Sequence, residues 1–272
     1  MAGRRARGEG APARIRGTFS PVFPYKDENP TVLTPITTIG LITANVLVWL
    51  VVQGAGSGEA VAASVCQLGL IPAELLRTAP LGTRVPLGPG LACFIDAPHY
   101  ASVLTSMFMH GGWLHIIGNM WFLWLFGNNI EDSMGHARFA AFYLLCGVVA
   151  AAAQVLTGPH SRVPMVGASG AISGVLGAYM LLYPRVRVHM LVTLGFYVTT
   201  VALPAYVMLG YWFVLQLLLG TVGTVSRAQG GIAVWAHVGG FVAGVALIKL
   251  FVDAELLERR EAAKGRPFPH DA

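Results

Sequence analysis

Two side chains that together can perform acyl-transfer chemistry lie inside long apolar stretches of this chain. Ser169 opens an uncharged apolar run, and His237 lies within another. A hydroxyl and an imidazole at bilayer depth are costly unless the protein uses or satisfies them. A serine nucleophile with a histidine base predicts an enzyme acting inside the membrane. Each residue also has a structural interpretation, Ser169 as a helix N-cap and His237 as a histidine hydrogen-bonded to a neighbouring helix.

The composition is that of a membrane protein. The 272 residues are 55% hydrophobic and 11% charged, whereas soluble domains carry about a quarter charged residues. Since a spanning helix needs about 20 apolar residues, we expect an all-α membrane protein with six spanning helices. The expected spans are 36–52, 113–127, 137–157, 169–183, 204–220 and 232–252. The apolar segment 190–203 is expected to lie at the interface or to lengthen the fifth span.

The distribution of basic residues predicts the orientation. Fourteen of the 18 Lys and Arg residues fall on the side that holds both chain ends, and this side is expected to be cytoplasmic. We expect three parts: a cytoplasmic tail 1–34, a membrane domain 35–252 and a charged cytoplasmic tail 253–272. The basic start leads into polar and Pro-rich residues, so no cleavable signal peptide is expected. The net charge of +5 is interpreted as this topogenic signal, and no nucleic-acid partner is expected.

A long outer loop, 54–112, joins the first two expected spans. Its prolines exclude one continuous helix. Cys66 and Cys93 lie in this loop, on the oxidising side of the membrane under the expected orientation. A disulfide between them is one prediction, and two small buried apolar side chains are the other.

Helix geometry places several polar side chains in one outer layer of the membrane. With a rise of 1.5 Å per residue, Ser169 and His237 lie roughly 8 Å below the outer surface. His115 and Asn119 lie at similar depth and share a helix face, because they are four residues apart. His110 precedes a Gly-Gly turn and is expected to cap that turn or to line the mouth of a cavity.

Glycines next to these residues predict close helix packing. Gly170 and Gly174 form one small-xxx-small pair, and Gly240 and Gly244 form another near His237. Such pairs let helix backbones approach closely. That approach would bring the hydroxyl and the imidazole within hydrogen-bonding reach.

Three segments resemble the rhomboid family of intramembrane serine proteases in order, spacing and placement. They are His-Gly-Gly-Trp-Leu-His-Ile-Ile-Gly-Asn at 110–119, Gly-Ala-Ser-Gly at 167–170 and Ala-His-Val-Gly-Gly-Phe-Val-Ala-Gly at 236–244. The resemblance covers roughly residues 35–252 and is closest to the bacterial six-span form. It implies a multi-pass protein of the bacterial cell membrane, with both tails in the cytoplasm.

The resemblance also implies roles for individual residues. Ser169 would be the nucleophile and His237 the general base and acid. His115, Asn119 and Gly167 would bind the oxyanion or the substrate, together with His110. The implied substrates are single-span membrane proteins, which would reach the site laterally between the second and fifth spans. We expect no metal and no cofactor, and the sequence leaves the oligomeric state open.

The chain departs from the family pattern at two places. Many relatives carry an aromatic residue four positions after the nucleophile, where it packs on the catalytic imidazole, but this chain has Ser173. Many also carry Trp-Arg before the second span, where this chain reads Ala-Pro-His-Tyr-Ala at 97–101. No Asp or Glu occurs in any expected span, so we expect packing alone to orient His237.

Two other functions are alternatives to proteolysis. A catalytically silent relative would bind membrane clients, and the intact Ser169 and His237 argue against it. A transporter would favour inverted repeats and charged groups near the midplane, and the sequence contains neither.

Overall fold

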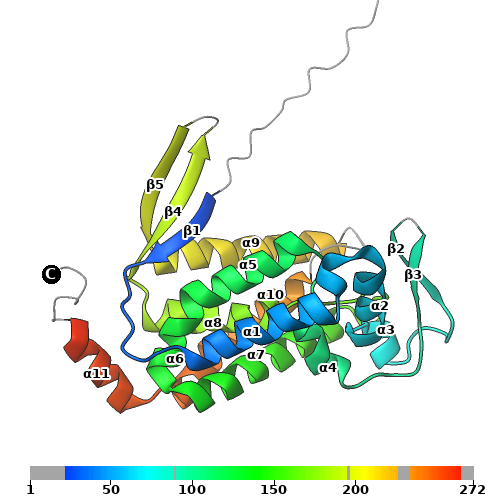
Figure 1. The fold of residues 1–272 in the computed structure, drawn as a ribbon, viewed down its shortest axis with the longest axis horizontal. Coiled ribbons are helices and arrows are strands. Elements are labelled where there is room, and N and C mark those ends of the chain that lie inside the picture. Colours follow the sequence, from blue (N-terminus) through cyan, green and yellow to red (C-terminus); the bar gives the residue numbers. More distant parts are fainter. Residues whose placement is uncertain (1–21, 89, 195–196, 226–232, 265–272) are drawn as a thin grey trace, which may run out of the picture.

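The protein is a bundle of long helices with additional structure at both ends (Figure 1). A computed structural model describes residues 22–88, 90–194, 197–225 and 233–264. The main helices are α1 Ile36–Val51, α5 Trp113–Phe122, α7 His136–Thr157, α8 Ser169–Leu182, α9 Ala205–Val225 and α10 Val234–Phe251. Each coincides with one of the expected spans to within a few residues.

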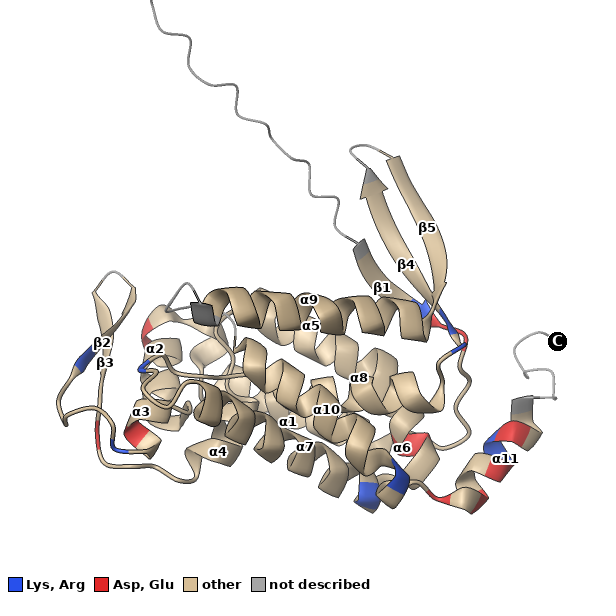
Figure 2. Ribbon diagram, turned by 180° about the vertical axis from the view of Figure 1, so that it is seen from behind, with Lys and Arg blue, Asp and Glu red and all other residues tan. Residues whose placement is uncertain are grey.

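Among the described residues, three helices are long and apolar enough to cross a membrane. They are α7, α10 and the Ala205–Gly223 part of α9, while α1 and α8 are shorter apolar helices. Figure 2 shows the charged residues gathered toward the two ends of the bundle, with none along the middle of the helices. This distribution matches an apolar belt between two aqueous ends. The six-span count stays a prediction.

The helix at the second expected span continues beyond the end of its apolar run. α5 continues through a π-helical segment, Leu123–Gly127, into α6 Asn128–Met134. α6 carries Glu131 and Asp132, both buried. The predicted span ends at residue 127 because charged residues such as these two usually lie outside the membrane. In the fold they are buried because hydrogen-bond donors surround them.

α8 and α10 pack with their backbones nearly in contact, as the glycine pairs predict. A Cβ added to Gly244 would overlap the carbonyl oxygen of Gly174, and one added to Gly240 would overlap that of Gly170. On the neighbouring side, a Cβ at Gly170 would lie 2.8 Å from the Ala150 Cβ of α7. Helices α7, α8 and α10 therefore form one tightly packed unit.

The outer loop is folded. It contains α2 Gly58–Leu68, α3 Pro72–Leu75, α4 Ser102–Thr105 and the short strands β2 Arg84–Gly88 and β3 Leu91–Phe94, with 3-10 turns at Gly54–Gly56 and Ser106–Phe108. A disulfide joins Cys66 of α2 to Cys93 of β3. It links the two halves of the loop, as the first of the two cysteine predictions proposed.

Of the two alternatives for 190–203, the extension of the fifth span was wrong, and a position at the interface stays a prediction. The segment lies in a hairpin of β4 Arg187–Leu194 and β5 Tyr197–Pro204. The preceding tail adds β1 Val22–Asp27 beside β4, in the strand order β1-β4-β5. The segment is rich in Val and Thr, whose branched side chains favour strands.

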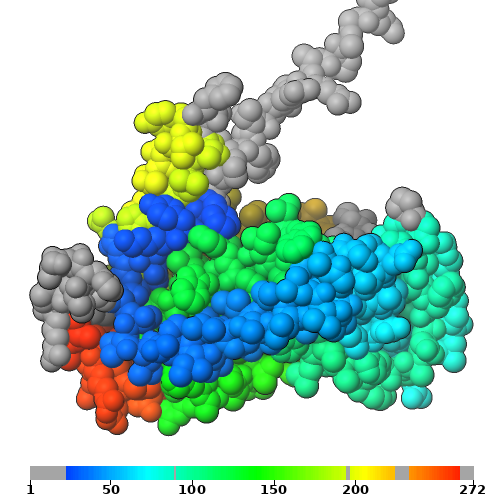
Figure 3. Space-filling model, in the orientation of Figure 1, coloured from blue at the N-terminus to red at the C-terminus, as the bar shows by residue number. Residues whose placement is uncertain are grey.

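Both predicted tails contain structure that packs at the same end of the bundle (Figure 3). The C-terminal tail forms α11 Ala254–Lys264, whose Arg260 is 1% exposed. The Arg260 guanidinium pairs with Asp132 of α6 at 3.1 Å and donates hydrogen bonds to Asn29 and Asn129. A buried charge is tolerated when it is paired and hydrogen-bonded in this way. We refer to these four residues as the Arg260 network.

A glycine substitution tests the contact between α8 and α10. Gly244→Val would place side-chain atoms where the Gly174 carbonyl lies. We expect a loss of about 3 kcal/mol or more in the free energy of unfolding, seen as a lower unfolding temperature in detergent. Gly210→Ala is the control, because a Cβ there meets nothing within 4 Å. Equal unfolding temperatures for the two variants would contradict the contact.

The raised pKa of the buried Asp27 carboxyl predicts that the stability of the protein depends on pH. Burial raises this pKa from 3.8 to about 6, against the opposing effect of a hydrogen bond from Tyr179. The folded state therefore holds this proton more tightly than the unfolded chain does. Its contribution to stability is fully present below about pH 4 and is lost as the pH rises through about 6.

The expected loss is on the order of 2–3 kcal/mol between these pH values. Thermal unfolding of the wild type and of Asp27→Asn would be compared from pH 4 to pH 7.5. The variant should lack this part of the decline, since its amide does not ionise. If both proteins decline in parallel, Asp27 is not the group responsible.

Candidate active site

Ser169 and His237 meet where α8 and α10 cross. The Ser169 Oγ and the His237 Nε2 are 2.8 Å apart, a distance suited to proton transfer between a nucleophile and its base. Ser169 does not cap its helix, because the N-cap of α8 is Ala168 and has no side-chain cap bond. The glycine contacts lie immediately beyond these two residues on both helices, and they allow the short side chain of Ser169 to reach the ring.

A buried amide contacts the other nitrogen of the same imidazole. The Oε1 of Gln216, on α9, lies 3.0 Å from the His237 Nδ1. The Trp212 ring, one turn earlier on α9, has its centroid 5.9 Å from that of His237. The expectation that packing alone orients His237 was therefore wrong. Gln216 was missed because it carries no charge. The signal that marks it in the sequence is a polar residue within an apolar run.

Two side chains of α5 that can donate hydrogen bonds lie beside Gly167, two residues before Ser169. Gly167 has a φ of +123°, a backbone conformation that favours glycine. A Cβ at this position would lie 2.7 Å from the His115 Nε2 and 3.6 Å from the Asn119 Nδ2. Both side chains therefore approach the backbone two residues before Ser169.

Asn119 and His115 each have an N–H group that can donate a hydrogen bond to an anion. The Asn119 Nδ2 is buried and has no hydrogen-bond partner among the described residues. The His115 Nδ1 accepts the backbone N–H of Gly111 at 3.3 Å, so a neutral His115 carries its proton on Nε2, the nitrogen near Gly167. The N-terminus of α8 adds free backbone N–H groups. Donors of this kind are what an oxyanion hole requires.

Comparison with known proteins identifies the family. The family described as Rhomboid domain matches residues 97–254, which is more than half of the chain. The chain belongs to the rhomboid family. Members of this family are integral membrane proteins, in agreement with the apolar helices of the bundle.

Three relatives illustrate the similarity. Rhomboid protease GluP of Bacillus subtilis (strain 168) is 31% identical over 165 residues, covering 61% of this chain and 29% of the relative. Putative rhomboid protease YdcA of the same organism is 35% identical over 78 residues, covering 29% of this chain and 39% of the relative. RHOMBOID-like protein 5 of Arabidopsis thaliana is 35% identical over 78 residues, covering 29% and 25%. The matched part spans between a quarter and two fifths of these relatives.

α8 lacks the aromatic residue that many rhomboids carry four positions after the nucleophile. Ser173, at the position where many rhomboids carry an aromatic ring, is 1% exposed and donates to the Ser169 carbonyl oxygen at 2.6 Å. Trp212 covers the imidazole from α9 instead. The aromatic contact with His237 is thus present, but another helix supplies it.

The last residue of the predicted site, His110, does not line an open cavity mouth. It is fully buried, and its ring lies against that of His115, with 5.2 Å between centroids. The Gln53 side chain holds the His110 backbone through two hydrogen bonds of 2.8 Å. His110 therefore supports the position of His115.

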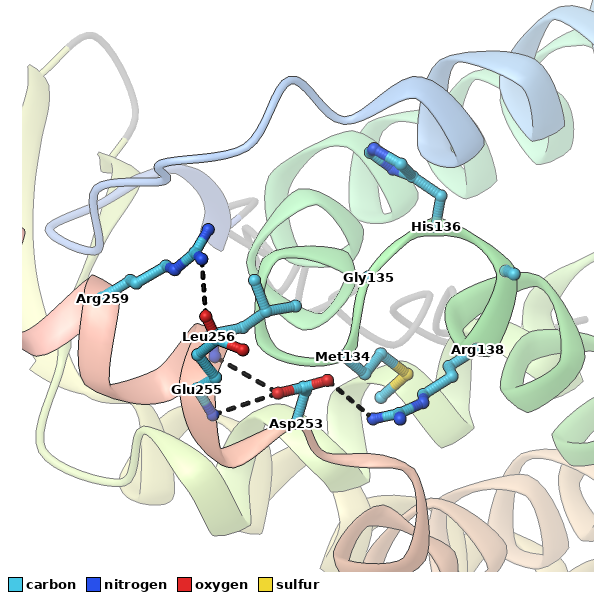
Figure 4. Close-up of a pocket in the computed structure, with 9 residues that line it drawn as sticks. Met134, Gly135, His136, Arg138, Asp253, Glu255, Leu256 and Arg259 are labelled. Atoms are coloured by element: carbon cyan, nitrogen blue, oxygen red, sulfur yellow. Dashed lines mark hydrogen bonds and ion pairs between the residues drawn. The ribbon is translucent and has the colours of Figure 1, made fainter.

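Two cavities differ in their volume and in the residues that line them. A recess of about 20 Å³ lies beside Ser169, between Ser106, Gly167 and Ala236, and this is enough for one water molecule. A larger cavity of about 330 Å³ lies at the opposite end, where α11 meets the α6–α7 junction (Figure 4). Its charged residues pair with one another, Arg138 with Asp253 and Arg259 with Glu255. The described lining offers no nucleophile beside a base, so the small recess is the candidate active site.

Proposed function

We propose that this rhomboid is an intramembrane serine endopeptidase that acts through a Ser169–His237 dyad. The observation that carries the proposal is the 2.8 Å contact between the Ser169 Oγ and the His237 Nε2. A nucleophile within hydrogen-bond distance of an oriented base is the recurring arrangement of such catalysis.

The first half of the reaction acylates the enzyme. The Ser169 Oγ attacks the carbonyl carbon of the scissile bond while its proton passes to the His237 Nε2. The resulting oxyanion accepts hydrogen bonds from the Asn119 Nδ2, the His115 Nε2 and the Ser169 backbone. One such donor is worth about 3–4 kcal/mol in the transition state. The C–N bond then breaks, and His237 gives the proton to the leaving amine.

The second half consumes one water molecule. The water gives a proton to His237 and attacks the acyl carbon, the ester bond to Ser169 breaks, and the proton returns to the Ser169 Oγ. The 20 Å³ recess beside Ser169 supports this step because it has room for that water.

The proposed topology has six spans, with β1 and α11 on the cytoplasmic side of a bacterial cell membrane. It is supported by the apolar helices and by the gathering of charges at the two ends of the bundle (Figure 2). The proposed substrates are single-span membrane proteins, reaching the site between α5 and α9. A substrate helix must unwind locally to expose its peptide bonds, so helix-weakening residues near the outer surface would favour cleavage.

A fluorophosphonate probe tests the dyad. We expect the wild type to be labelled at Ser169, Ser169→Ala to be unlabelled, and His237→Ala to be labelled at least about a thousandfold more slowly. Ser133→Ala is the control, because it removes another buried hydroxyl at the far end of the bundle. If the wild type stays unlabelled where an active rhomboid is labelled in parallel, the chain is a silent relative.

Co-expression with a panel of tagged single-span proteins tests the substrate class. We expect one or more of them to be cleaved near the outer end of the transmembrane segment by the wild type and not by Ser169→Ala. Cleavage only of soluble proteins would contradict the proposed substrate class.

A further inference from the structure

Gln216 is a buried amide among exposed leucines of α9. It is 8% exposed, whereas the neighbouring Leu215, Leu218 and Leu219 are 37%, 58% and 45% exposed. An amide inside a membrane-length apolar helix is costly unless it forms hydrogen bonds. The contact that the structure gives this side chain is the one between its Oε1 and the His237 Nδ1, at 3.0 Å.

The chemistry of this contact determines which nitrogen of His237 is a base. An amide oxygen can only accept, so the proton of a neutral His237 lies on Nδ1. The Nε2 lone pair is then directed at the Ser169 Oγ, which is the tautomer that can remove the hydroxyl proton. The other tautomer would present an N–H to Ser169 and could not act as its base.

Both contacts that hold the imidazole from this side come from α9. Gln216 accepts at its Nδ1 edge, and Trp212, one turn away, lies against the ring. α9 is itself seated on α10 by the stacked rings of Phe213 and Phe241, whose centroids are 4.5 Å apart. Neither Ser169 nor any α8 side chain makes the contact at Nδ1.

We propose that Gln216 is a positioning residue that fixes the reactive tautomer of His237 when α9 is seated against α10. The proposal rests on the proposed proteolytic function and deepens it, since it adds a third side chain to the dyad. Gln216 does not touch substrate and acts only through His237.

Two variants separate this role from a structural one. Gln216→Leu keeps a similar volume and removes the acceptor. Gln216→Glu keeps the shape and, when ionised, can only accept. Leu218→Ala is the matched control, because it shortens an exposed side chain two residues further along α9. Rates of fluorophosphonate labelling, and kcat and KM for a cleaved single-span protein, would be measured across pH.

We expect Gln216→Leu to lower the labelling rate and kcat about 10- to 100-fold, with KM nearly unchanged. Gln216→Glu should recover most of the rate at high pH, and the acid limb of its profile should move to higher pH by about one unit, because a carboxylate stabilises the imidazolium. The other titratable group that acts on His237 among the described residues is His115. It is unchanged in both variants, so it cannot produce the difference. Leu218→Ala should match the wild type.

Nitrogen NMR of histidine-labelled protein in detergent gives a readout independent of turnover. The signal assigned to His237, by its absence in His237→Asn, should report a proton on Nδ1 in the wild type and a mixture of tautomers in Gln216→Leu. The proposal is wrong if Gln216→Leu keeps the wild-type rate, or if its tautomer is unchanged. A wild type that is neither labelled nor cleaves any substrate would instead refute the proposed function.

Discussion

The near-contact of the α8 and α10 backbones is the constraint on which the site depends. Gly240 and Gly244 lie against the carbonyls of Gly170 and Gly174, where no Cβ fits. Lipid offers helices little hydrophobic drive to associate, so close van der Waals packing of this kind has to hold them together. The same approach sets the distance between Ser169 and His237, because a short hydroxyl side chain reaches an imidazole only across a narrow gap. Stability and chemistry thus depend on the same glycines.

The two ends of the bundle treat buried polar groups differently. At the end that holds α6 and α11, Asp132 accepts backbone N–H groups from Val32 and Leu33 and pairs with Arg260, while Glu131 accepts from Thr37 and Thr38. At the other end, the Asn119 Nδ2 has no partner in the described part of the chain. Groups that are paired, such as the Asp132 carboxylate, hold structure, whereas a buried donor without a partner beside Gly167 is free to bind a charge that develops during a reaction.

Much of this arrangement could be read from the sequence. Apolar runs with sharp ends located the helices, and polar residues inside those runs located Ser169, His237, His115 and Asn119. The β4–β5 hairpin was missed because an apolar segment of that length suits either a strand or a helix, and its pairing with β1 is a contact distant in sequence. The buried Glu131 and Asp132 were missed for a similar reason, since their partners lie about 100 residues away.

Ser173 shows where a family pattern misleads. Ser173 leaves α8 without an aromatic ring to contact the imidazole, yet Trp212 and Gln216 supply ring contact and acceptor from α9. The usual rhomboid position could not reveal this, because the compensation occurs on a different helix, 39 and 43 residues later in the chain.

That transfer of support makes the imidazole dependent on the helix beside which a transmembrane substrate would be admitted. A displacement of α9 would withdraw the amide and the indole together. His237 would then lack the two contacts that direct it until the helix returned. Admission and bond cleavage would follow one another in time, so a passing protein that fails to let α9 close again would leave uncut.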